Sequence, residues 1–358
     1  MIKVMLVAGG TGGHVFPALA LAEALAARKA TCIFVRDKRT KDLYARNNRE
    51  VHLITAATFG AGIYKKLRGL FLIVAGLIES LDLLREERPD VVVGFGGYPS
   101  FPTVFAAQII GIPTVIHEQN AILGRANRVL LRLAKVLAVS FTSVQNIPAA
   151  HAAKAVYTGN PIRAVFTEGA VDYPDWGGKV RLCITGGSQG SKIFTQLVPQ
   201  AVELMRPDLR ARLAITQQVR AEDMEQVEKT YDRLGVRAEL APFFDDMKNF
   251  FGRAHLVVCR AGASTVAEIT AVGRPALFIP LAISLDGDQA KNAEQLVAQG
   301  AAWVMAEKDA TPATLAGLLE GLLSDPAGLE KAALAATKAG RPQAADDLAD
   351  LVLRRRKK

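Results

Sequence analysis

A glycine-rich turn near the N-terminus constrains the fold more than any other feature of this sequence. The segment GGTGGH at residues 9–14 lies between an apolar run of strand length, residues 2–8, and an alanine- and leucine-rich run with helical periodicity, residues 17–29. A strand, a glycine turn and a helix form the opening of a βαβ unit. A second such turn, at residues 186–191, follows the apolar run 180–185. The sequence therefore predicts two domains that begin in the same way.

Short β-branched runs alternate with longer helical patterns along the chain, which is typical of parallel sheets with right-handed crossovers. In the first half we expect strands at 2–8, 31–35, 51–55, 91–94, 113–117 and 136–140, and helices at 17–29, 64–87, 103–110 and 121–134. In the second half we expect strands at 180–185, 211–216, 255–259, 275–279 and 302–305. The sequence TGNP at residues 158–161 interrupts the pattern, so we expect domains at 1–160 and 161–342. A last helix at about 343–354 could pack on either domain.

Composition restricts the class of protein but not its ligand. The chain has 358 residues, of which 50% are hydrophobic and 22% charged, so it is long enough for two domain cores and has no sign of disorder. The net charge is +9, and residues 354–358 supply five positive charges. A basic surplus suits nucleic acid, anionic lipid or a polyanionic small molecule. Because the charge is diffuse, aromatic residues make up only 6% and no nucleic-acid module is present, we expect no nucleic-acid partner.

The cysteines and the apolar runs indicate a reduced protein that does not span a membrane. Cys32, Cys183 and Cys259 lie in separate apolar runs, which predicts buried thiols in a cytosolic protein and no metal site or disulfide. The N-terminus lacks the pattern of a signal peptide. The apolar stretch at 70–78 is far shorter than the roughly 20 residues that a membrane-spanning helix needs. We therefore expect a soluble or peripheral protein.

Two familiar nucleotide motifs are absent from the glycine turns. A dinucleotide fingerprint that starts at Gly10 would need glycine where the chain has Val15, and a P-loop would need glycine and lysine where it has Ser191 and Lys192. These mismatches argue against NAD binding and ATP hydrolysis. The turn at 186–191 still offers backbone N–H groups and two serine hydroxyls to a diphosphate, although an ordinary βα turn remains an alternative.

The segment CRAGASTVAE at residues 259–268 is the most informative in the second half. Ser264 and Thr265 open a helix after a glycine turn, so free N–H groups and hydroxyls suit a phosphate. Glu268 lies one helical turn beyond Ser264, where its carboxylate can accept from the hydroxyls of a ribose. A capping box between Thr265 and Glu268 is the structural alternative. Gln289 and Asn292 follow the next strand, and short amides there suit sugar hydroxyls.

Polar side chains also follow two strands of the first half. GFGGYPS at 94–100 and HEQN at 117–120 each come directly after an apolar run. Polar groups at such positions are costly unless they are hydrogen-bonded, so they indicate a cleft between the two domains rather than a core. His14, in the first turn, is the side chain there that can move a proton near neutral pH.

A basic and apolar stretch at residues 64–73 has two interpretations. Lys65, Lys66 and Arg68 alternate with large apolar side chains, including Phe71 and Leu72. An ordinary amphipathic helix with a solvated basic face accounts for this pattern. The alternative is a surface that rests on an anionic membrane leaflet.

Eight motifs in order across nearly the whole chain resemble a known family. They are GGTGGHVFPALALA, GFGGYPSFP, HEQNAILGRANR, TGNPIR, ITGGSQGS, FFDDM, CRAGASTVAE and DGDQAKNA. The set resembles the bacterial peptidoglycan N-acetylglucosaminyl transferases that make lipid II, the MurG family. The resemblance implies a GT-B fold, in which two Rossmann-like α/β domains with parallel sheets face each other and the last helix, 343–358, packs back on the first domain.

The resemblance also implies the reaction and its partners. The family transfers GlcNAc from UDP-GlcNAc to the muramoyl 4-hydroxyl of undecaprenyl-pyrophosphoryl-MurNAc-pentapeptide (lipid I), with inversion and without a metal or other cofactor. It works in peptidoglycan synthesis, and so in cell shape and division, as a peripheral protein on the cytoplasmic face of the bacterial inner membrane. The implied partners are the donor, lipid I, an anionic membrane surface and other cell-wall synthesis proteins.

The family's site residues carry over by position. Thr11, Gly12 and Gly13 border the sugar diphosphate, close to Asn120. The other implied donor contacts are Arg163 and Ser191 from the second domain, the backbone of Phe244, the run Ala263, Ser264, Thr265, Val266, Ala267 and Glu268, and the amides of Gln289 and Asn292. Asp288 stands where family members usually have histidine or glutamine, so we expect no donor contact from it.

The chemistry needs one base and stabilisation of the leaving diphosphate. His14 is the first candidate for the base and Glu118 the second, while Arg163 and helix N–H groups would stabilise UDP. A UDP-GlcNAc 2-epimerase shares the fold and the UDP-sugar site, and is the alternative enzyme. A sugar-nucleotide sensor without activity is the alternative outside enzymes.

Overall fold

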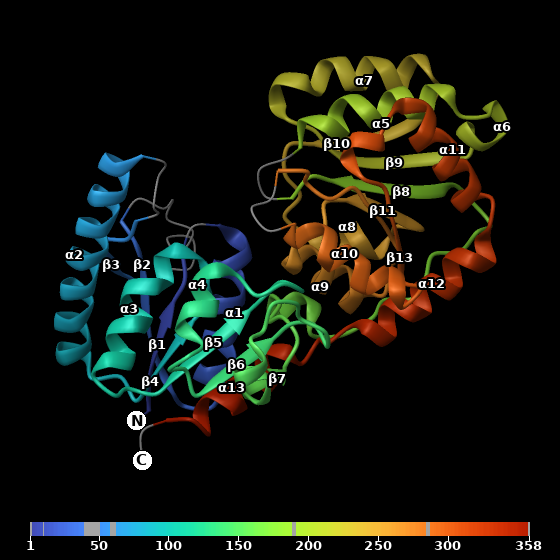
Figure 1. Ribbon diagram of the computed structural model, residues 1–358. Helices are drawn as coiled ribbons and strands as arrows, with labels where there is room; N and C mark the ends of the chain where they lie inside the picture. The colour runs from blue at the N-terminus through green and yellow to red at the C-terminus, as the bar shows by residue number, and fades with distance from the viewer. Residues whose placement is uncertain are drawn as a thin grey trace. The chain divides into compact units, whose positions relative to one another are not determined.

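The computed structural model describes residues 2–9, 11–38, 51–57, 62–187, 191–283 and 287–356. The chain divides into two compact units (Figure 1). Unit 1 comprises Met1–Ala164 and Gln343–Lys358, and unit 2 comprises Val165–Pro342. Each unit contains one parallel sheet with helices on its faces, so the α/β class predicted from the alternating pattern is confirmed.

The described residues of unit 1 form a seven-stranded sheet in the order β3-β2-β1-β4-β5-β6-β7, and all pairs are parallel. The strands are β1 (Lys3–Val7), β2 (Thr31–Asp37), β3 (Val51–Ile54), β4 (Val91–Gly94), β5 (Thr114–Glu118), β6 (Val136–Val139) and β7 (Ala155–Tyr157). The helices are α1 (Gly12–Ala27), α2 (Ile63–Glu87), α3 (Gly97–Ile109), α4 (Arg125–Leu130) and α13 (Ala344–Leu353). The central strands are apolar throughout because helices cover both faces of the sheet.

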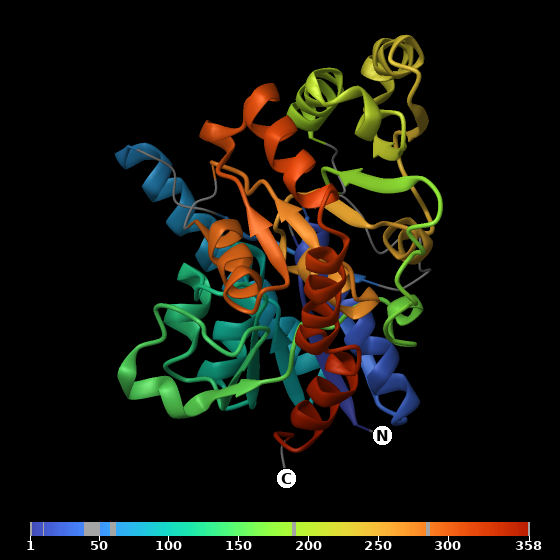
Figure 2. The ribbon, with the colours of Figure 1, turned by 90° about the vertical axis from the view of Figure 1, so that its right-hand side faces the viewer.

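The two faces of this sheet have separate cores. On one face Leu21 of α1 and Leu348 of α13 pack against the buried side chains of β1 and β4. On the other face Leu83 of α2 and Val104 of α3 belong to the second core. Helix α13 lies beside α1 (Figures 1 and 2), and Arg28 at the end of α1 pairs with Asp346 at 2.8 Å and Asp350 at 2.6 Å. The C-terminal helix is therefore part of unit 1.

The described residues of unit 2 form a six-stranded parallel sheet in the order β10-β9-β8-β11-β12-β13. The strands are β8 (Val180–Thr185), β9 (Leu213–Gln218), β10 (Arg237–Ala241), β11 (Leu256–Cys259), β12 (Ala276–Phe278) and β13 (Ala302–Val304). The helices are α5 (Lys192–Leu204), α6 (Pro207–Arg210), α7 (Met224–Arg233), α8 (Met247–Gly252), α9 (Ala263–Val272), α10 (Asp288–Ala298), α11 (Pro312–Leu323) and α12 (Pro326–Ala339). Helices α5 and α11 pack together over one face of this sheet (Figures 1 and 2).

Several predicted elements differ from the structure. Helices α1 and α3 begin at Gly12 and Gly97, several residues before the predicted starts, because glycine has a low helix propensity and hides the first turn from a pattern search. The helix expected at 121–134 is reduced to α4. Strands β7 and β10 were not expected. They are short edge strands with partly exposed side chains, so they lack the apolar run of a central strand.

Among the described residues, none of the helices combines the length and the apolar character that a membrane span requires.

Cys183 and Cys259 are fully buried in β8 and β11, and burial raises the pKa of the Cys183 thiol to about 12. These thiols therefore behave as apolar core groups.

Arg274 is a buried cation that ties the start of unit 2 to its helices. Its side chain is only 1% exposed and lies over the ring of Tyr173. The guanidinium donates to five backbone carbonyls, those of Val171, Asp172, Gly252, Val272 and Gly273. Two of these residues end helices α8 and α9, where the helix dipole favours a positive charge. Burial lowers the pKa of the group to about 10, so it stays charged at neutral pH.

Replacing Arg274 with methionine is expected to destabilise unit 2 by at least about 3 kcal/mol, because several buried carbonyls lose their donor at once. Urea unfolding followed by tryptophan fluorescence would measure this loss selectively, since both tryptophans of the chain, Trp176 and Trp303, lie in unit 2. The exposed Arg206→Met is the matched control and should shift the midpoint little. An equal shift in both variants would contradict the role of Arg274.

Candidate active site

Apart from Arg163, which comes after β7, the candidate catalytic and donor-binding residues of unit 1 lie at the carboxyl ends of β1 and β5, and the motif at 94–100 lies at the end of β4 between them. Because these strands are parallel, their carboxyl ends meet at one edge of the sheet. The chain order reverses between β1 and β4, so the loops after these two strands diverge and leave space beyond the sheet. This edge is where ligands bind in open α/β sheets.

The turn between β1 and α1 is tightly packed. A side chain at Gly9 would meet the ring of Pro99 at 3.2 Å, and one at Gly12 would meet the ring of Phe16 at 2.8 Å. Thr11 precedes the helix, and its side chain forms no capping hydrogen bond. The first turn of α1 also contains no acidic residue. The N–H groups of Gly12 and Gly13 thus face a site that favours an anion; Gly10 lies outside the described residues.

A backbone carbonyl fixes the proton of His14. The ring nitrogen Nδ1 of His14 lies 2.7 Å from the carbonyl oxygen of Phe95, which can only accept, so Nδ1 carries the hydrogen. In the neutral ring the lone pair is then on Nε2. Gln119 donates its amide to the same carbonyl at 2.8 Å. The contact with Phe95 therefore fixes the tautomer in which the neutral ring carries its hydrogen on Nδ1.

Glu118 is surrounded by donors. Its side chain is 3% exposed, and the carboxylate accepts from Asn120 N at 3.1 Å, Gly124 N at 2.9 Å and Asn127 Nδ2 at 2.8 Å. The amide of Asn120 adds a longer contact of 3.4 Å. Burial raises the pKa of Glu118, and these hydrogen bonds oppose the rise. The carboxylate fixes the turn from residue 120 to 127 and with it the position of Asn120.

Arg163 lies in unit 1, next to the border with unit 2. Its guanidinium lies 5.8 Å from the centre of the Phe16 ring, a cation–π arrangement on the first turns of α1. The predicted contacts Thr11, Gly12, Gly13, His14 and Arg163 thus belong to one region of unit 1.

Apart from Phe244, the candidate residues of unit 2 follow the three equivalent strands, β8, β11 and β12. After β8 the N–H of Gly186 donates to Gln218 and that of Gly187 to the hydroxyl of Thr185. Ser191 precedes α5, and its side chain forms no capping hydrogen bond. Residues 188–190 of this predicted phosphate turn lie outside the described residues.

The turn after β11 is not the capping box considered from the sequence. Helix α9 begins at Ala263 with Gly262 as its N-cap, so Thr265 lies inside the first turn. The hydroxyl of Ser264 is buried and has no partner among the described atoms. Such a group at a helix N-terminus is suited to a phosphate oxygen. Glu268 is buried one turn further, beside Val266 and Ala267 in the same helix.

Hydrogen bonds with backbone groups fix both of the side-chain amides that are predicted to bind the sugar. Asn292 is fully buried and donates to the carbonyl of Ala261 at 3.0 Å. Gln289 is partly exposed, and its carbonyl oxygen accepts from Leu281 N at 3.0 Å. The carboxylate of Asp288 accepts from Gln289 N, so it stabilises the first turn of α10.

Phe244 lies in the loop between β10 and α8. Its ring packs on that of Phe250 with a centroid distance of 4.8 Å. This contact holds the side chain of Phe244 against α8.

Sequence reasoning missed the supporting roles of Gln119, Asn127, Arg260 and Glu307. The first two lie inside the HEQNAILGRANR motif, so their position was a usable signal. Arg260 and Glu307 form an ion pair at 3.0 Å although 47 positions separate them, and no pattern in the neighbouring sequence predicts that contact.

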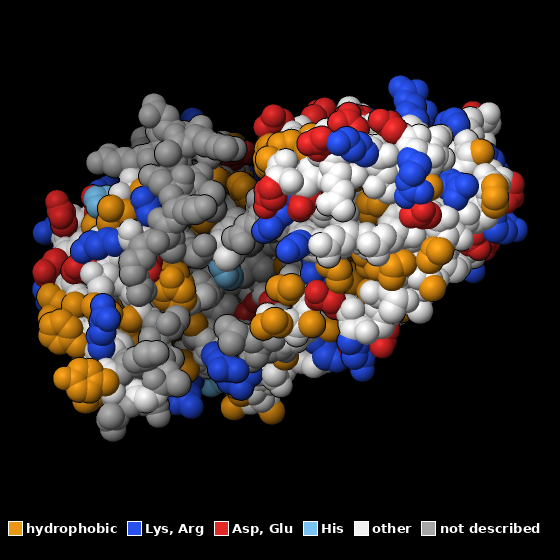
Figure 3. Space-filling view, turned by 90° about the horizontal axis from the view of Figure 1, so that it is seen from above, with side chains coloured by type: hydrophobic (Ala, Val, Ile, Leu, Met, Phe, Trp, Pro, Cys, Tyr) orange, Lys and Arg blue, Asp and Glu red, His pale blue; other side chains and the backbone are white. Residues whose placement is uncertain are grey.

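Helix α2 exposes an apolar face. Tyr64, Leu67, Phe71, Val74 and Ile78 lie on one side of the helix and are 45% to 87% exposed. Figure 3 shows hydrophobic side chains gathered at the outer edge of unit 1, where α2 lies. Arg68 is exposed beside them and Leu72 is partly buried, whereas the side chains of Lys65 and Lys66 lie outside the described residues.

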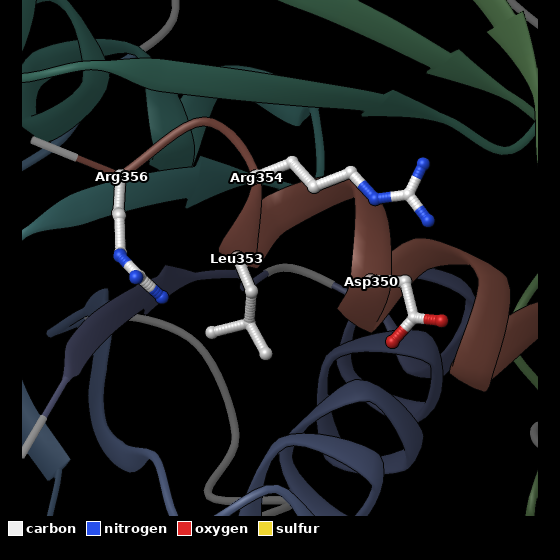
Figure 4. Close-up of a pocket in the computed structure, with 4 residues that line it drawn as sticks. All are labelled: Asp350, Leu353, Arg354 and Arg356. Atoms are coloured by element: carbon white, nitrogen blue, oxygen red, sulfur yellow. The ribbon is translucent and has the colours of Figure 1, made fainter.

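A shallow cavity of about 520 Å³ lies at the end of α13 and is lined by Asp350, Leu353, Arg354 and Arg356 (Figure 4). None of the candidate residues lines it. Within the described residues, no group of three or more His, Cys, Asp and Glu could hold a metal ion.

Comparison with known proteins gives family matches for both units. Residues 4–139 match the glycosyltransferase family 28 N-terminal domain, and residues 181–348 match the family 28 C-terminal domain. The chain is 45% identical over 357 residues to the UDP-N-acetylglucosamine–N-acetylmuramyl-(pentapeptide) pyrophosphoryl-undecaprenol N-acetylglucosamine transferase of Rhodospirillum centenum, covering 99% of this chain and 94% of the relative. It is 45% identical to the protein of the same name from Brucella canis, covering 97% and 93%.

Solved structures give the same picture of the fold. The crystal structure of Acinetobacter baumannii MurG matches with a TM-score of 0.83 and 30% identity, covering 99% of this chain and all of the other. A UDP-GlcNAc 2-epimerase from Neisseria meningitidis, bound to UDP-GlcNAc, matches with a TM-score of 0.68 but only 15% identity. The second likeness shows the fold alone.

His117 is expected to make unit 1 sensitive to acid. The ring is 0% exposed, donates Nε2–H to the carbonyl of Gly159 and lies near His14. Burial is the main cause that lowers the pKa of His117 from 6.5 to about 4. Above pH 6.5 the ring is neutral in both folded and unfolded chains. As the pH falls from 6.5 toward 4 the unfolded chain binds the proton first, so stability is lost, by about 2 kcal/mol at pH 5.

Hydrogen exchange of the β5 amides at pH 7.5 and pH 5 would measure this effect. In His117→Gln, whose amide can still donate to Gly159, the extra loss at pH 5 should disappear. His151→Gln, at a partly exposed position, is the control and should keep the loss. An unchanged acid sensitivity in His117→Gln would refute the assignment.

Proposed function

Because this chain belongs to the MurG family within glycosyltransferase family 28, we propose that it transfers N-acetylglucosamine from UDP-GlcNAc to the N-acetylmuramyl unit of a pentapeptide carried on pyrophosphoryl-undecaprenol. The observation that carries the proposal is the 45% identity, over 99% of the chain, to a relative with that activity in its name. The geometry of both units supports it.

His14 is the base in this mechanism. Its Nδ1–H is bound by the Phe95 carbonyl, so Nε2 takes the proton from the 4-hydroxyl of the acceptor sugar. As that oxygen forms a bond to the anomeric carbon, the bond from this carbon to the UDP oxygen breaks on the opposite face. UDP leaves with the electron pair, and the configuration is inverted. No covalent intermediate on the protein is needed.

Glu118 acts as a positioning residue rather than as the base. Its carboxylate already accepts from Asn120, Gly124 and Asn127, and it is almost completely buried. A proton acceptor must reach the acceptor hydroxyl, which a carboxylate occupied in this way does not do.

Unit 2 holds the nucleotide in this proposal. Ser264 and Thr265, with the N–H groups of α9, bind the diphosphate, and Glu268 accepts from the ribose hydroxyls. The backbone of Phe244 contacts the uracil, and Gln289 and Asn292 serve the sugar. Arg163, Asn120 and the N-terminus of α1 stabilise the charge that develops on the departing UDP. The buried hydroxyl of Ser264 supports the phosphate position most directly.

Helix α2 is the membrane contact. Its exposed apolar face includes Phe71, Arg68 is exposed beside it, and the sequence of this stretch adds Lys65 and Lys66. A polyprenyl-linked acceptor lies in a membrane. We place the enzyme at the cytoplasmic face of the inner membrane as a peripheral protein.

Replacing His14 with glutamine is expected to lower kcat by about 10²- to 10⁴-fold, because the base is removed, while the affinity for UDP-GlcNAc stays the same. UDP release would be measured with a short-chain lipid I analogue in EDTA, with His151→Gln as the control. Glu118→Gln should lose less activity than His14→Gln. A larger loss in Glu118→Gln would make Glu118 the base, and release of UDP with formation of ManNAc in the absence of acceptor would instead indicate the epimerase.

Neutralising Lys65, Lys66 and Arg68 together with glutamine is expected to weaken binding to anionic vesicles by roughly 100-fold, since each charge near such a surface contributes about 1 kcal/mol. Flotation with phosphatidylglycerol vesicles at low and high salt would test this. The control removes three charges from unit 2, at Arg206, Arg210 and Arg212. Equal losses in the two triple variants would count against a docking site on α2.

A further inference from the structure

Arg260 and Glu307 form a partly buried ion pair next to the predicted nucleotide site. The guanidinium follows β11 and donates Nη1 to one carboxylate oxygen at 3.0 Å and Nη2 to the other at 3.2 Å. It lies 5.3 Å from the centre of the Phe194 ring. The two side chains are 11% and 24% exposed, so the pair is screened less than an ordinary surface pair.

This ion pair holds both ends of the segment that follows β12. Arg260 also donates Nη1 to the carbonyl of Ile279 at 2.9 Å. Glu307 also accepts from the N–H of Ala282 at 2.8 Å. The backbone from Ile279 to Ala282 is thus fixed by the same pair at its start and at its end.

The middle of this segment orients Gln289. The N–H of Leu281 donates to the side-chain carbonyl oxygen of Gln289 at 3.0 Å. Because that oxygen is engaged by backbone, the NH2 group is the end of the amide that can meet a ligand. An amide NH2 only donates, so its partner must be an oxygen that accepts.

We propose that Glu307 is a positioning residue for the sugar of the donor: through Arg260 and the segment Ile279–Ala282 it fixes Gln289 so that the amide donates to a hexosamine oxygen. The inference rests on the proposed function and deepens it. Ser264 lies in the same turn as Arg260, but Glu307 itself accepts from the backbone of Ala282, and Phe244 belongs to another loop. The loss of Glu307 therefore falls mainly on the sugar contact. Glu307 thereby sets the preference for UDP-GlcNAc over UDP.

Two variants of Glu307 test this role by calorimetry with UDP and with UDP-GlcNAc. Glu307→Ala removes both the ion pair and the acceptor for Ala282, and is expected to weaken UDP-GlcNAc binding at least tenfold with UDP binding unchanged within twofold. Glu307→Gln keeps an acceptor oxygen and should fall between wild type and Glu307→Ala. Unchanged UDP binding also shows that unit 2 is folded.

A double variant separates positioning from a general structural effect. Gln289→Ala alone should lose the same factor for UDP-GlcNAc, and Glu307→Ala with Gln289→Ala should lose little more than either single variant, because both act through one contact. Glu239→Ala, which breaks the ion pair of unit 2 with Arg253, is the control and should bind both ligands normally.

Equal losses for UDP and UDP-GlcNAc, or additive losses in the double variant, would overturn the role of Glu307. The proposed function has its own test. Wild-type protein that fails to transfer GlcNAc to the lipid I analogue would overturn the function. Wild-type protein that transfers, together with a Glu307→Ala variant that still prefers UDP-GlcNAc, would overturn only this inference.

Discussion

The parallel arrangement of strands determines where the candidate catalytic and donor-binding residues lie. In each sheet the first strand of the unit is central: β1 lies between β2 and β4, and β8 lies between β9 and β11. The chain adds strands on one side of this first strand and then crosses to its other side, so the strand order reverses there. The loops after β1, β4 and β5 in unit 1 and after β8, β11 and β12 in unit 2 therefore occupy equivalent positions. Short loops can then carry the chemistry because the sheet fixes their ends.

Within unit 1, backbone carbonyls orient His14, Gln119 and His117. The carbonyl of Phe95 accepts from His14 and Gln119, and the carbonyl of Gly159 accepts from His117. A neutral acceptor fixes a ring and its tautomer without placing a counter-charge beside it. Such a contact fixes the tautomer of His14, which the proposed function assigns as the base.

The sequence allowed much of this to be predicted because the information is local. Glycine turns between apolar strands and helices predicted the fold class, and the motifs identified the family, which the comparisons confirm. Ser264 at the opening of a helix is visible in four or five residues of sequence. The strands β7 and β10 could not be predicted in this way, because edge strands lack the apolar pattern that identifies central strands.

Contacts between distant segments could not be predicted in this way. The ion pair of Arg260 with Glu307 and the five carbonyl contacts of Arg274 join loops that only the folded sheet brings together. From the sequence, each of these side chains is an ordinary charged residue. The capping-box alternative for Thr265 and Glu268 had the right spacing, but the helix starts two residues before Thr265, so the pattern did not apply.

The position of α13 has a consequence for the order in which the chain can fold. Leu348, Ala349 and Val352 complete the core on the α1 face of unit 1, although they are made after the whole of unit 2. During synthesis, unit 2 has all of its strands and helices while this face of unit 1 is still uncovered. The N-terminal unit is therefore the last to be completed, and a fragment that stops before residue 343 would expose the apolar surface that α13 covers.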